Sequence, residues 1–297
     1  MKQVFEKILQ SPVTALTAHK SSILVGDIEG NIILFESESF ASLNSVKVHK
    51  KSLRSLTVHD SSIVSASSSG NVAITDLATF SVERRLKLPE KTAVSYLHPV
   101  LPNIIALGDD DGILSFVDIR VREKEGSIRK SSLFDDYISS IISFPNFANN
   151  ILVTSGDGTL CYFDYQAGKT IAKCDGLDDE ITCAAKTDEF GSKVICMTAT
   201  GAVNIFKFDY WGQPDDRILL EDGVSCCCKA SNDSIYFSLF DGSIYEFKDH
   251  RARRLCQTDE DISCMLFDSS RLILAADNQL KIFSDACSTE DFYHNID

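Results

Sequence analysis

The sequence predicts an all-β protein that folds as a single seven-bladed WD-type β-propeller, and two repeated patterns support this prediction. A short polar turn between apolar residues recurs along the chain, and its closing Gly falls at residues 30, 70, 112, 158, 201 and 242. A further short strand precedes each of these hairpins. A period of about 40 residues with four strands in each unit is typical of propeller blades.

The turn of each hairpin explains the repeated Gly. Apolar residues on both sides of a short polar turn, as at 151–153 and 160–163, indicate a β-hairpin. Such a turn needs one residue with a positive φ, which Gly tolerates best and Asn next. The seventh repeat has Asn278 where the others have Gly, so we expect Asn278 to adopt the positive φ.

The strand before each hairpin is expected to be the innermost strand of its blade. Its third residue is usually Ala, Ser or Cys, and small residues fit there because inner strands crowd together around a propeller axis. The seven copies begin at Val13, Leu53, Val94, Ile138, Ile181, Val224 and Ile262. A fourth strand follows most hairpins, so blades account for residues 12–285.

The last blade lacks a fourth strand, because the chain after Asp285 is short and polar. Val4–Leu9 belongs to no complete blade. We therefore predict that this segment is the outer strand of the last blade, paired with Gln279–Phe283, since ring closure removes exposed strand edges. The predicted single domain at 1–297 comprises a closing segment at 1–11, the blades at 12–285 and a polar tail at 286–297.

The composition favours an acidic intracellular protein. The net charge is −14 and the pI is near 4.8, so the chain lacks overall the basic surface that broad nucleic-acid binding needs and suits basic partners. The ten Cys form no evident disulfide framework, which indicates reduced thiols. No signal-peptide pattern begins at Met1, and no apolar run approaches the length of a membrane span.

No motif predicts an enzyme, a metal site or a cofactor. The run 226–228 is three adjacent Cys, but neighbours on a strand face opposite sides, and zinc sites use spaced pairs. Cys183, Cys226 and Cys264 occupy the same place in successive blades, so we interpret them as small core residues. The six His are scattered, and no nucleophile elbow, zinc-binding helix or phosphate-binding loop occurs.

The acidic residues point to one face of the propeller. The hairpin turns and the connections between blades lie on the same face, and they carry eight and ten of the 43 acidic residues. Asp also favours turns for its own hydrogen bonding, which accounts for part of this excess. The protein-binding candidates in the connections are Asp135, Asp136, Asp178, Asp179, Glu180, Asp259, Glu260 and Asp261.

One aromatic residue and the basic clusters complete the candidate sites. Trp211 lies in the longest loop between third and fourth strands, where it either contacts a partner or covers the blade edge. The clusters at 120–124 and 248–254 start on the opposite face, and that at 47–54 interrupts the acidic face. For each of these basic clusters, the alternative interpretation is a group of ordinary solvated surface charges. The RNA-contact candidates are Lys50, Lys51, Arg54, Arg251, Arg253 and Arg254.

The blades resemble WD repeats in which the usual Trp-Asp ending is reduced to Val117-Asp118 and Phe163-Asp164. The usual Gly-His before the inner strand is missing, so the standard His–Asp hydrogen-bond network is not predicted. Within that superfamily the chain resembles the WD repeat-containing protein 55 family. The matching segments, which span blades three to six, are 107–112, Asp118-Ile119-Arg120, Asp136-Tyr137-Ile138-Ser139, 155–160, Trp211-Gly212 and Asp216-Arg217.

This resemblance implies a non-enzymatic nucleolar scaffold in ribosome biogenesis and pre-rRNA processing. It implies basic protein partners, such as ribosomal proteins or assembly factors, with indirect RNA contact, for a monomer within a larger complex. The family tends to carry a basic C-terminal tail, whereas 290–297 is acidic, so a tail-based nuclear address is missing and a cytoplasmic location stays open. The alternative function is a generic propeller adaptor, as a ubiquitin-ligase substrate receptor or a trafficking subunit. A propeller hydrolase is disfavoured because no titratable residues converge.

Overall fold

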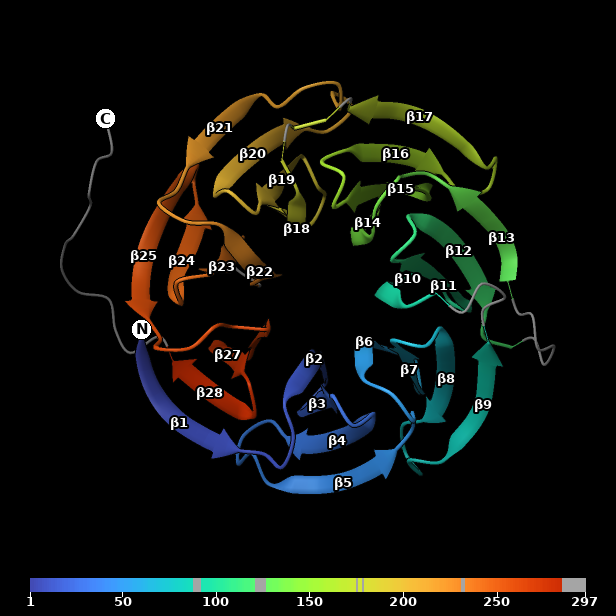
Figure 1. The fold of residues 1–297 in the computed structure, drawn as a ribbon, viewed down its shortest axis with the longest axis vertical. Helices are drawn as coiled ribbons and strands as arrows, with labels where there is room; N and C mark the ends of the chain where they lie inside the picture. The colour runs from blue at the N-terminus through green and yellow to red at the C-terminus, as the bar shows by residue number, and fades with distance from the viewer. Residues whose placement is uncertain (88–91, 121–126, 175, 178, 231–232, 285–297) are drawn as a thin grey trace.

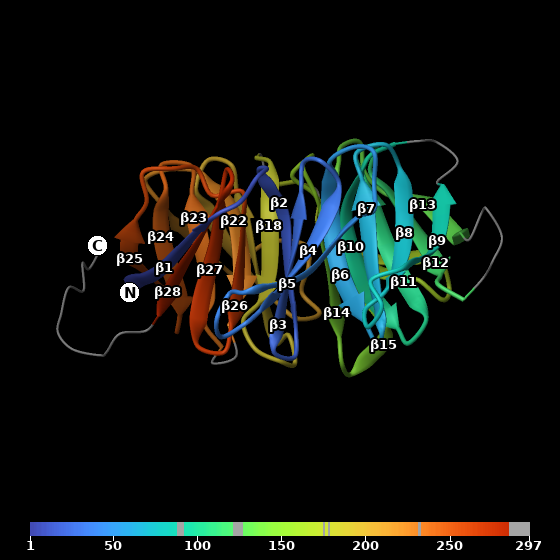
Figure 2. The same ribbon diagram turned by 90° about the horizontal axis from the view of Figure 1, so that it is seen from below.

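The computed structural model describes residues 1–87, 92–120, 127–174, 176–177, 179–230 and 233–284. These residues contain no helix and form 28 β-strands in seven four-stranded antiparallel sheets. The sheets surround a central axis as blades (Figure 1), and the side view shows a flat disc (Figure 2). The prediction of an all-β, seven-bladed propeller is therefore confirmed.

Each of the first six blades runs outward from the axis in chain order. Blade one has β2 (Val13–His19), β3 (Ser22–Asp27), β4 (Asn31–Glu36) and β5 (Ser42–Lys47). Blade two has β6 (Leu53–His59), β7 (Ser62–Ser67), β8 (Asn71–Asp76) and β9 (Val82–Lys87). Blade three has β10 (Val94–Leu101), β11 (Ile104–Asp109), β12 (Ile113–Asp118) and β13 (Ser127–Ser132).

The remaining blades follow the same order. Blade four has β14 (Ile138–Phe144), β15 (Phe147–Ser155), β16 (Leu160–Asp164) and β17 (Lys169–Cys174). Blade five has β18 (Ile181–Lys186), β19 (Lys193–Thr198), β20 (Ala202–Lys207) and β21 (Asp216–Leu219). Blade six has β22 (Val224–Lys229), β23 (Ile235–Leu239), β24 (Ser243–Lys248) and β25 (Arg251–Gln257). Blade seven has β26 (Cys264–Asp268), β27 (Arg271–Ala276), β28 (Gln279–Ser284) and β1 (Lys2–Ile8).

The N-terminal strand closes the ring. β1 pairs antiparallel with β28, from Lys2 opposite Ser284 to Ile8 opposite Gln279 (Figure 1). The predicted closure is confirmed, although the strand starts two residues earlier than Val4 and ends one residue before Leu9. The polar tail predicted at 286–297 lies outside the described residues.

The six turn glycines behave as expected. All have a positive φ, between 69° and 89°. The Gly30 carbonyl accepts a hydrogen bond from Val48 N at 2.9 Å, and the Gly112 carbonyl accepts one from Leu133 N at 3.2 Å. These bonds join the two turns to the connections that follow the same blades. We call the face that carries these turns and connections the connection face.

The seventh turn differs from its prediction. The residue with positive φ is Asp277, at 49°, and Asn278 is not among the residues with positive φ. Only these two residues separate β27 from β28, so the left-handed position moves to the first of them. Asn278 instead binds the N-terminal segment, because its carbonyl accepts from Leu9 N at 2.7 Å and its Nδ2 donates to the Leu9 carbonyl at 3.2 Å.

The core consists of seven hydrophobic clusters, each shared by two neighbouring blades. The inner strand β22 shows how a strand serves two clusters. Cys226 and Cys228 pack toward blade seven, beside Ile262, whereas Cys227 packs toward blade five, beside Cys183. This alternation follows from strand geometry. The Cys residues therefore fill small spaces between blades.

Candidate protein-binding site on the connection face

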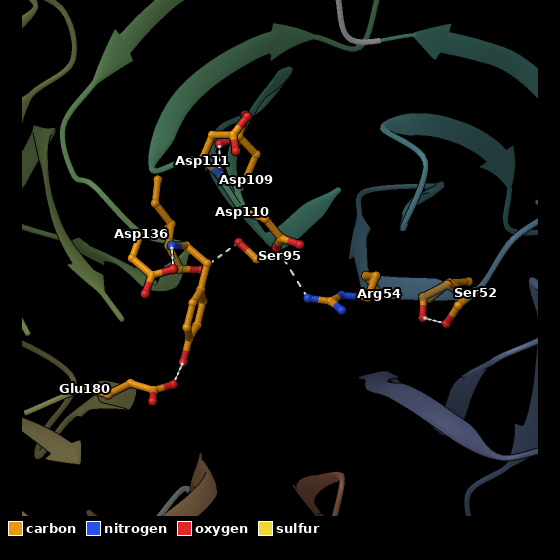
Figure 3. A network of polar contacts seen from close by, with 11 residues as sticks. Ser52, Arg54, Ser95, Asp109, Asp110, Asp111, Asp136 and Glu180 are labelled. Atoms are coloured by element: carbon orange, nitrogen blue, oxygen red, sulfur yellow. Dashed lines mark hydrogen bonds and ion pairs between the residues drawn. The ribbon is translucent and has the colours of Figure 1, made fainter. Parts of the chain in front are cut away.

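Side chains from three consecutive blade junctions meet on the connection face close to the axis. Arg54 is the second residue of β6, Asp110 lies in the turn between β11 and β12, and Asp136 and Tyr137 precede β14. Glu180 precedes β18. Figure 3 shows Arg54, Asp110, Asp136 and Glu180 gathered on the inner side of their blades. We call these five residues the inner cluster.

Hydrogen bonds and one ion pair link the members of the inner cluster. Arg54 Nη2 lies 3.4 Å from Asp110 Oδ1, and the Tyr137 hydroxyl donates to Glu180 Oε1 at 2.7 Å. A hollow of about 230 Å³ is lined by Arg54, Asp110, Asp136 and Tyr137. It is large enough for the end of a side chain from a partner.

Local structure explains why Asp110 is available. The neighbouring Asp109 is buried, and its Oδ1 accepts from Ile113 N at 2.8 Å and Asp111 N at 3.1 Å. Asp109 therefore accepts the backbone hydrogen bonds that stabilise the turn. The Asp110 side chain is left to face Arg54 (Figure 3).

A glycine makes room for Tyr137. A Cβ on Gly156 would lie 2.4 Å from Tyr137 Cε1, so only Gly at this position allows the ring to lie against the blade-four turn. The backbone is tied as well, because Gly156 N donates to the Tyr137 carbonyl at 2.9 Å. The segment 155–158, which resembles the WD repeat-containing protein 55 family, thus has a physical role in seating Tyr137.

The electrostatics of the inner cluster favour an added positive charge. Burial raises the pKa of Asp110, the carboxylates of Asp111 and Asp136 raise it further, and Arg54 opposes them. Burial, and then the hydrogen bond to Glu180, raises the pKa of Tyr137, so its hydroxyl stays a donor. The cluster holds three carboxylates against one guanidinium. A Lys or Arg from a partner would improve this balance.

The other predicted acidic residues of blades four and five have mixed roles. Asp135 is exposed, and its N–H donates to Asp157 Oδ2 at 3.1 Å. Asp179 ties its connection to the next blade, because it accepts from Thr200 N at 3.0 Å and from the Thr200 hydroxyl. Burial raises the pKa of Asp179, but these and other hydrogen bonds outweigh it and leave the pKa below its usual value. Asp178 lies outside the described residues.

The acidic run before blade seven lies apart from the inner cluster. Glu260 is engaged within its own blade, since its carboxylate accepts from Gln279 Nε2 at 3.0 Å and from Lys281 Nζ at 2.8 Å. Asp259 and Asp261 are exposed. Only these two residues of the run are therefore directed to solvent.

The predicted basic candidates do not form one surface. Lys50 and Lys51 are exposed in the connection between blades one and two, whereas Arg54 is paired with Asp110. The other three lie on β25, the outer strand of blade six, at the circumference (Figure 1). There Arg251 is exposed, Arg253 pairs with Glu246 at 2.9 Å, and Arg254 Nη2 donates to Gln257 Oε1 at 2.5 Å.

The structure corrects the expectation that Trp211 is a contact residue. Its side chain is only 2% exposed and packs in the cluster between blades four and five. The ring centroids of Tyr162 and Phe208 lie 5.5 and 5.7 Å from that of the indole. The long loop folds back onto the blades because burial of a large aromatic ring is favourable in free energy. The alternative, a ring that covers the blade edge, is the one observed.

Asp110 and Tyr137 were not among the predicted site residues. Both could have been found from a signal in the sequence. Asp110 is the middle of three consecutive Asp, more than one turn requires. Tyr137 is an aromatic residue directly after two Asp in a connection.

The described residues contain no group of three or more His, Cys, Asp or Glu placed to hold a metal ion. Burial raises the pKa of the Cys226 and Cys264 thiols. Within the same part of the chain, no helix is long and apolar enough to span a membrane.

Several known proteins are similar to this chain, although no family model matches it. A WD repeat-containing protein of Schizosaccharomyces pombe, named as uncharacterized, is 34% identical over 148 residues, which is 48% of this chain and 40% of that protein. WD repeat-containing protein 55 of Arabidopsis thaliana is 29% identical over 235 residues, which is 76% of this chain and 65% of that protein. The same protein of Bos taurus is 25% identical over 247 residues, which is 80% of this chain and 63% of that protein.

These relatives confirm the resemblance that the motifs of blades three to six indicated. The chain folds as a seven-bladed β-propeller and is similar to WD repeat-containing protein 55. It spans less than two thirds of the length of these curated relatives.

Proposed function

We propose that this chain is a non-enzymatic WD-repeat scaffold that binds proteins through its connection face. The observation that carries the proposal is the inner cluster, in which Asp110 and Asp136 line a hollow together with Arg54 and Tyr137. Glu180 is tied to this hollow through its hydrogen bond with the Tyr137 hydroxyl (Figure 3). We propose that the hollow accepts a Lys or Arg of the partner. The exposed Asp135, in the same connection as Asp136, then attracts the surrounding basic segment.

We further propose that the partners are ribosomal proteins or ribosome-assembly factors, and that the chain acts in pre-rRNA processing in the nucleus or nucleolus. The resemblance to the WD repeat-containing protein 55 family supports this role. The net charge of −14 suits basic partners and disfavours direct RNA binding. RNA contact is therefore proposed to be indirect, with the exposed Lys50, Lys51 and Arg251 as its secondary candidates.

Charge reversal tests the binding site. The variant combines Asp136→Lys with Glu180→Lys, and the control combines Asp259→Lys with Asp261→Lys on the same face with the same change in net charge. Affinity capture from cells should lose the basic partners in the first variant and retain them in the control. Unchanged capture by the first variant would contradict the proposed site, and equal loss in both would assign binding to the whole acidic face.

Depletion of the protein tests the process. Unprocessed large-subunit rRNA precursors should accumulate before growth stops, and the protein should sediment with pre-ribosomal particles. Normal precursor levels, together with sedimentation as a free protein, would favour the generic adaptor instead.

A further inference from the structure

A second pocket lies along the axis, toward the face opposite the connection face. Its volume is about 270 Å³, and residues of four successive inner strands, β10, β14, β18 and β22, line it. These strands follow one another around the axis (Figure 1). The polar side chains of the lining include His98, Ser143, Lys186 and Lys229, and none of the lining residues is acidic. We call this space the axial pocket.

Hydrogen bonds hold one wall of the axial pocket in place. His98 Nε2 lies 2.9 Å from the Ser143 hydroxyl, and Lys186 Nζ donates to the Ser143 carbonyl at 2.9 Å. Three neighbouring blades are thereby joined by groups that also face the pocket. Ser143 is the shared member, since its side chain and its backbone each serve one partner.

The side chain of Lys229, in contrast, is not held by hydrogen bonds to the described part of the chain. Its Nζ is shielded from solvent and has no hydrogen-bond partner among the described residues. The Asp233 carboxylate lies 3.9 Å away, beyond hydrogen-bonding distance, and is itself largely exposed. An ammonium group in this position has unsatisfied donors, which is unfavourable unless a further acceptor is supplied.

The charges around the axial pocket favour an anion. Burial, and then the charge of Lys229, lowers the pKa of Lys186, while burial lowers that of Lys229. Asp188, Glu189 and Asp233 oppose these shifts from the adjoining turns, but they do not line the pocket. Asp188 is also engaged by Gly191 N at 2.6 Å and Ser192 N at 3.0 Å.

We propose that the axial pocket binds a phosphate group, with Lys186 and Lys229 as its charged ligands. A phosphate dianion matches two ammonium groups, and its oxygens supply the acceptors that Lys229 lacks. The Ser143 hydroxyl is a further donor. Ile141, Ala184 and Cys227 form an apolar part of the lining, which suits the organic portion of a phosphate monoester.

Calorimetric titration of the full chain tests the proposal. Inorganic phosphate is the first probe and phenyl phosphate the second, both at an ionic strength held constant with sodium chloride. We expect saturable binding, weakened about tenfold or more by Lys186→Met and by Lys229→Met. Lys169→Met is the control, because Lys169 is exposed on the outer strand β17 and the substitution changes the charge equally. If phenyl phosphate binds more tightly than inorganic phosphate, the ligand is a phosphate monoester. If the two bind equally, the ligand is free phosphate.

Two further measurements keep the test decisive. Lys229→Arg, which retains the charge, should retain binding, and circular dichroism should show that each variant is folded. Absence of saturable phosphate binding to the wild-type protein would overturn the proposal. An equal loss in Lys169→Met would also overturn it, by showing non-specific charge attraction. The axial pocket is separate from the inner cluster, so neither result bears on protein capture.

Discussion

His49 Nε2 lies 2.9 Å from the hydroxyl of Ser65, and both side chains are buried. His49 belongs to the connection between blades one and two, and Ser65 to β7. The degraded repeats did not predict such a bond, because no Gly-His precedes the inner strands. One connection nevertheless keeps a buried His that joins it to the next blade.

His49, which is buried, and His98, which is half-buried, predict a loss of stability in mild acid. Burial and then Arg85 lower the pKa of His49 from 6.5 to about 4, and burial and then Lys186 lower that of His98 to about 4. Between pH 6.5 and 4 the unfolded chain therefore binds more protons than the folded one, so the free energy of unfolding falls as pH falls. Each His contributes up to about 1.4 kcal/mol per pH unit in this window.

Urea denaturation between pH 7.5 and 4.5 measures this effect. The variant His49→Gln/His98→Gln should show a shallower dependence on pH than the wild type, while His19→Gln, outside the core, should not. Carboxylates with lowered pKa values contribute equally to all three proteins. The same slope in the double variant and the wild type would contradict the prediction.

Trp211 and Tyr210 are neighbours whose replacement by Ala should change the stability by very different amounts. Trp211→Ala should lower the free energy of unfolding by about 3–5 kcal/mol, because it leaves a cavity between blades four and five. Tyr210 is 54% exposed, so Tyr210→Ala should change the free energy by about 0.5 kcal/mol or less. Urea denaturation followed by circular dichroism measures both. Similar values for the two variants would argue against the buried position of Trp211.

Removal of the closing strand should destabilise the ring. Without residues 1–8, the edge of β28 is unpaired and available to other chains. We expect a lower Tm in calorimetry and self-association in light scattering. The control is Gln3→Ala with Glu6→Ala, which removes only an exposed hydrogen bond within β1. A truncated chain as stable and monomeric as this control would show that closure by β1 is dispensable.

Gly112 and Gly212 allow the same Gly→Ala substitution to be compared at a strained and at an open position. Gly112 has a φ of +72°, and a Cβ there would lie 2.4 Å from the Phe134 carbonyl oxygen. Gly212 has nothing within 4 Å of its would-be Cβ. Gly112→Ala should therefore lower the free energy of unfolding by about 1–3 kcal/mol, whereas Gly212→Ala should leave it unchanged or slightly higher. Chemical denaturation compares them, and equal effects would refute the strain at Gly112.

Much of the fold could be predicted because its causes are local. Gly112 shows why, since its positive φ is required by the turn itself and repeats in every blade but the last. Asp277 shows the limit of such a rule. In the shorter seventh turn the positive φ lies one position earlier, and Asn278 instead binds the closing segment at Leu9.

The sequence by itself determined the number of blades and the strand order within each, because hydrophobic alternation and turn chemistry act over a few residues. It also indicated the closure by the N-terminal strand, because the last blade lacks a fourth strand of its own. Only the tertiary structure decided which side chains meet at the axis. Arg54, Asp110 and Tyr137 belong to three successive blades and meet only when those blades pack side by side. The same holds for Lys186 and Lys229, and for Trp211, whose burial depends on the neighbouring blade. Contacts between blades depend on packing across the ring, which no local pattern of residues records.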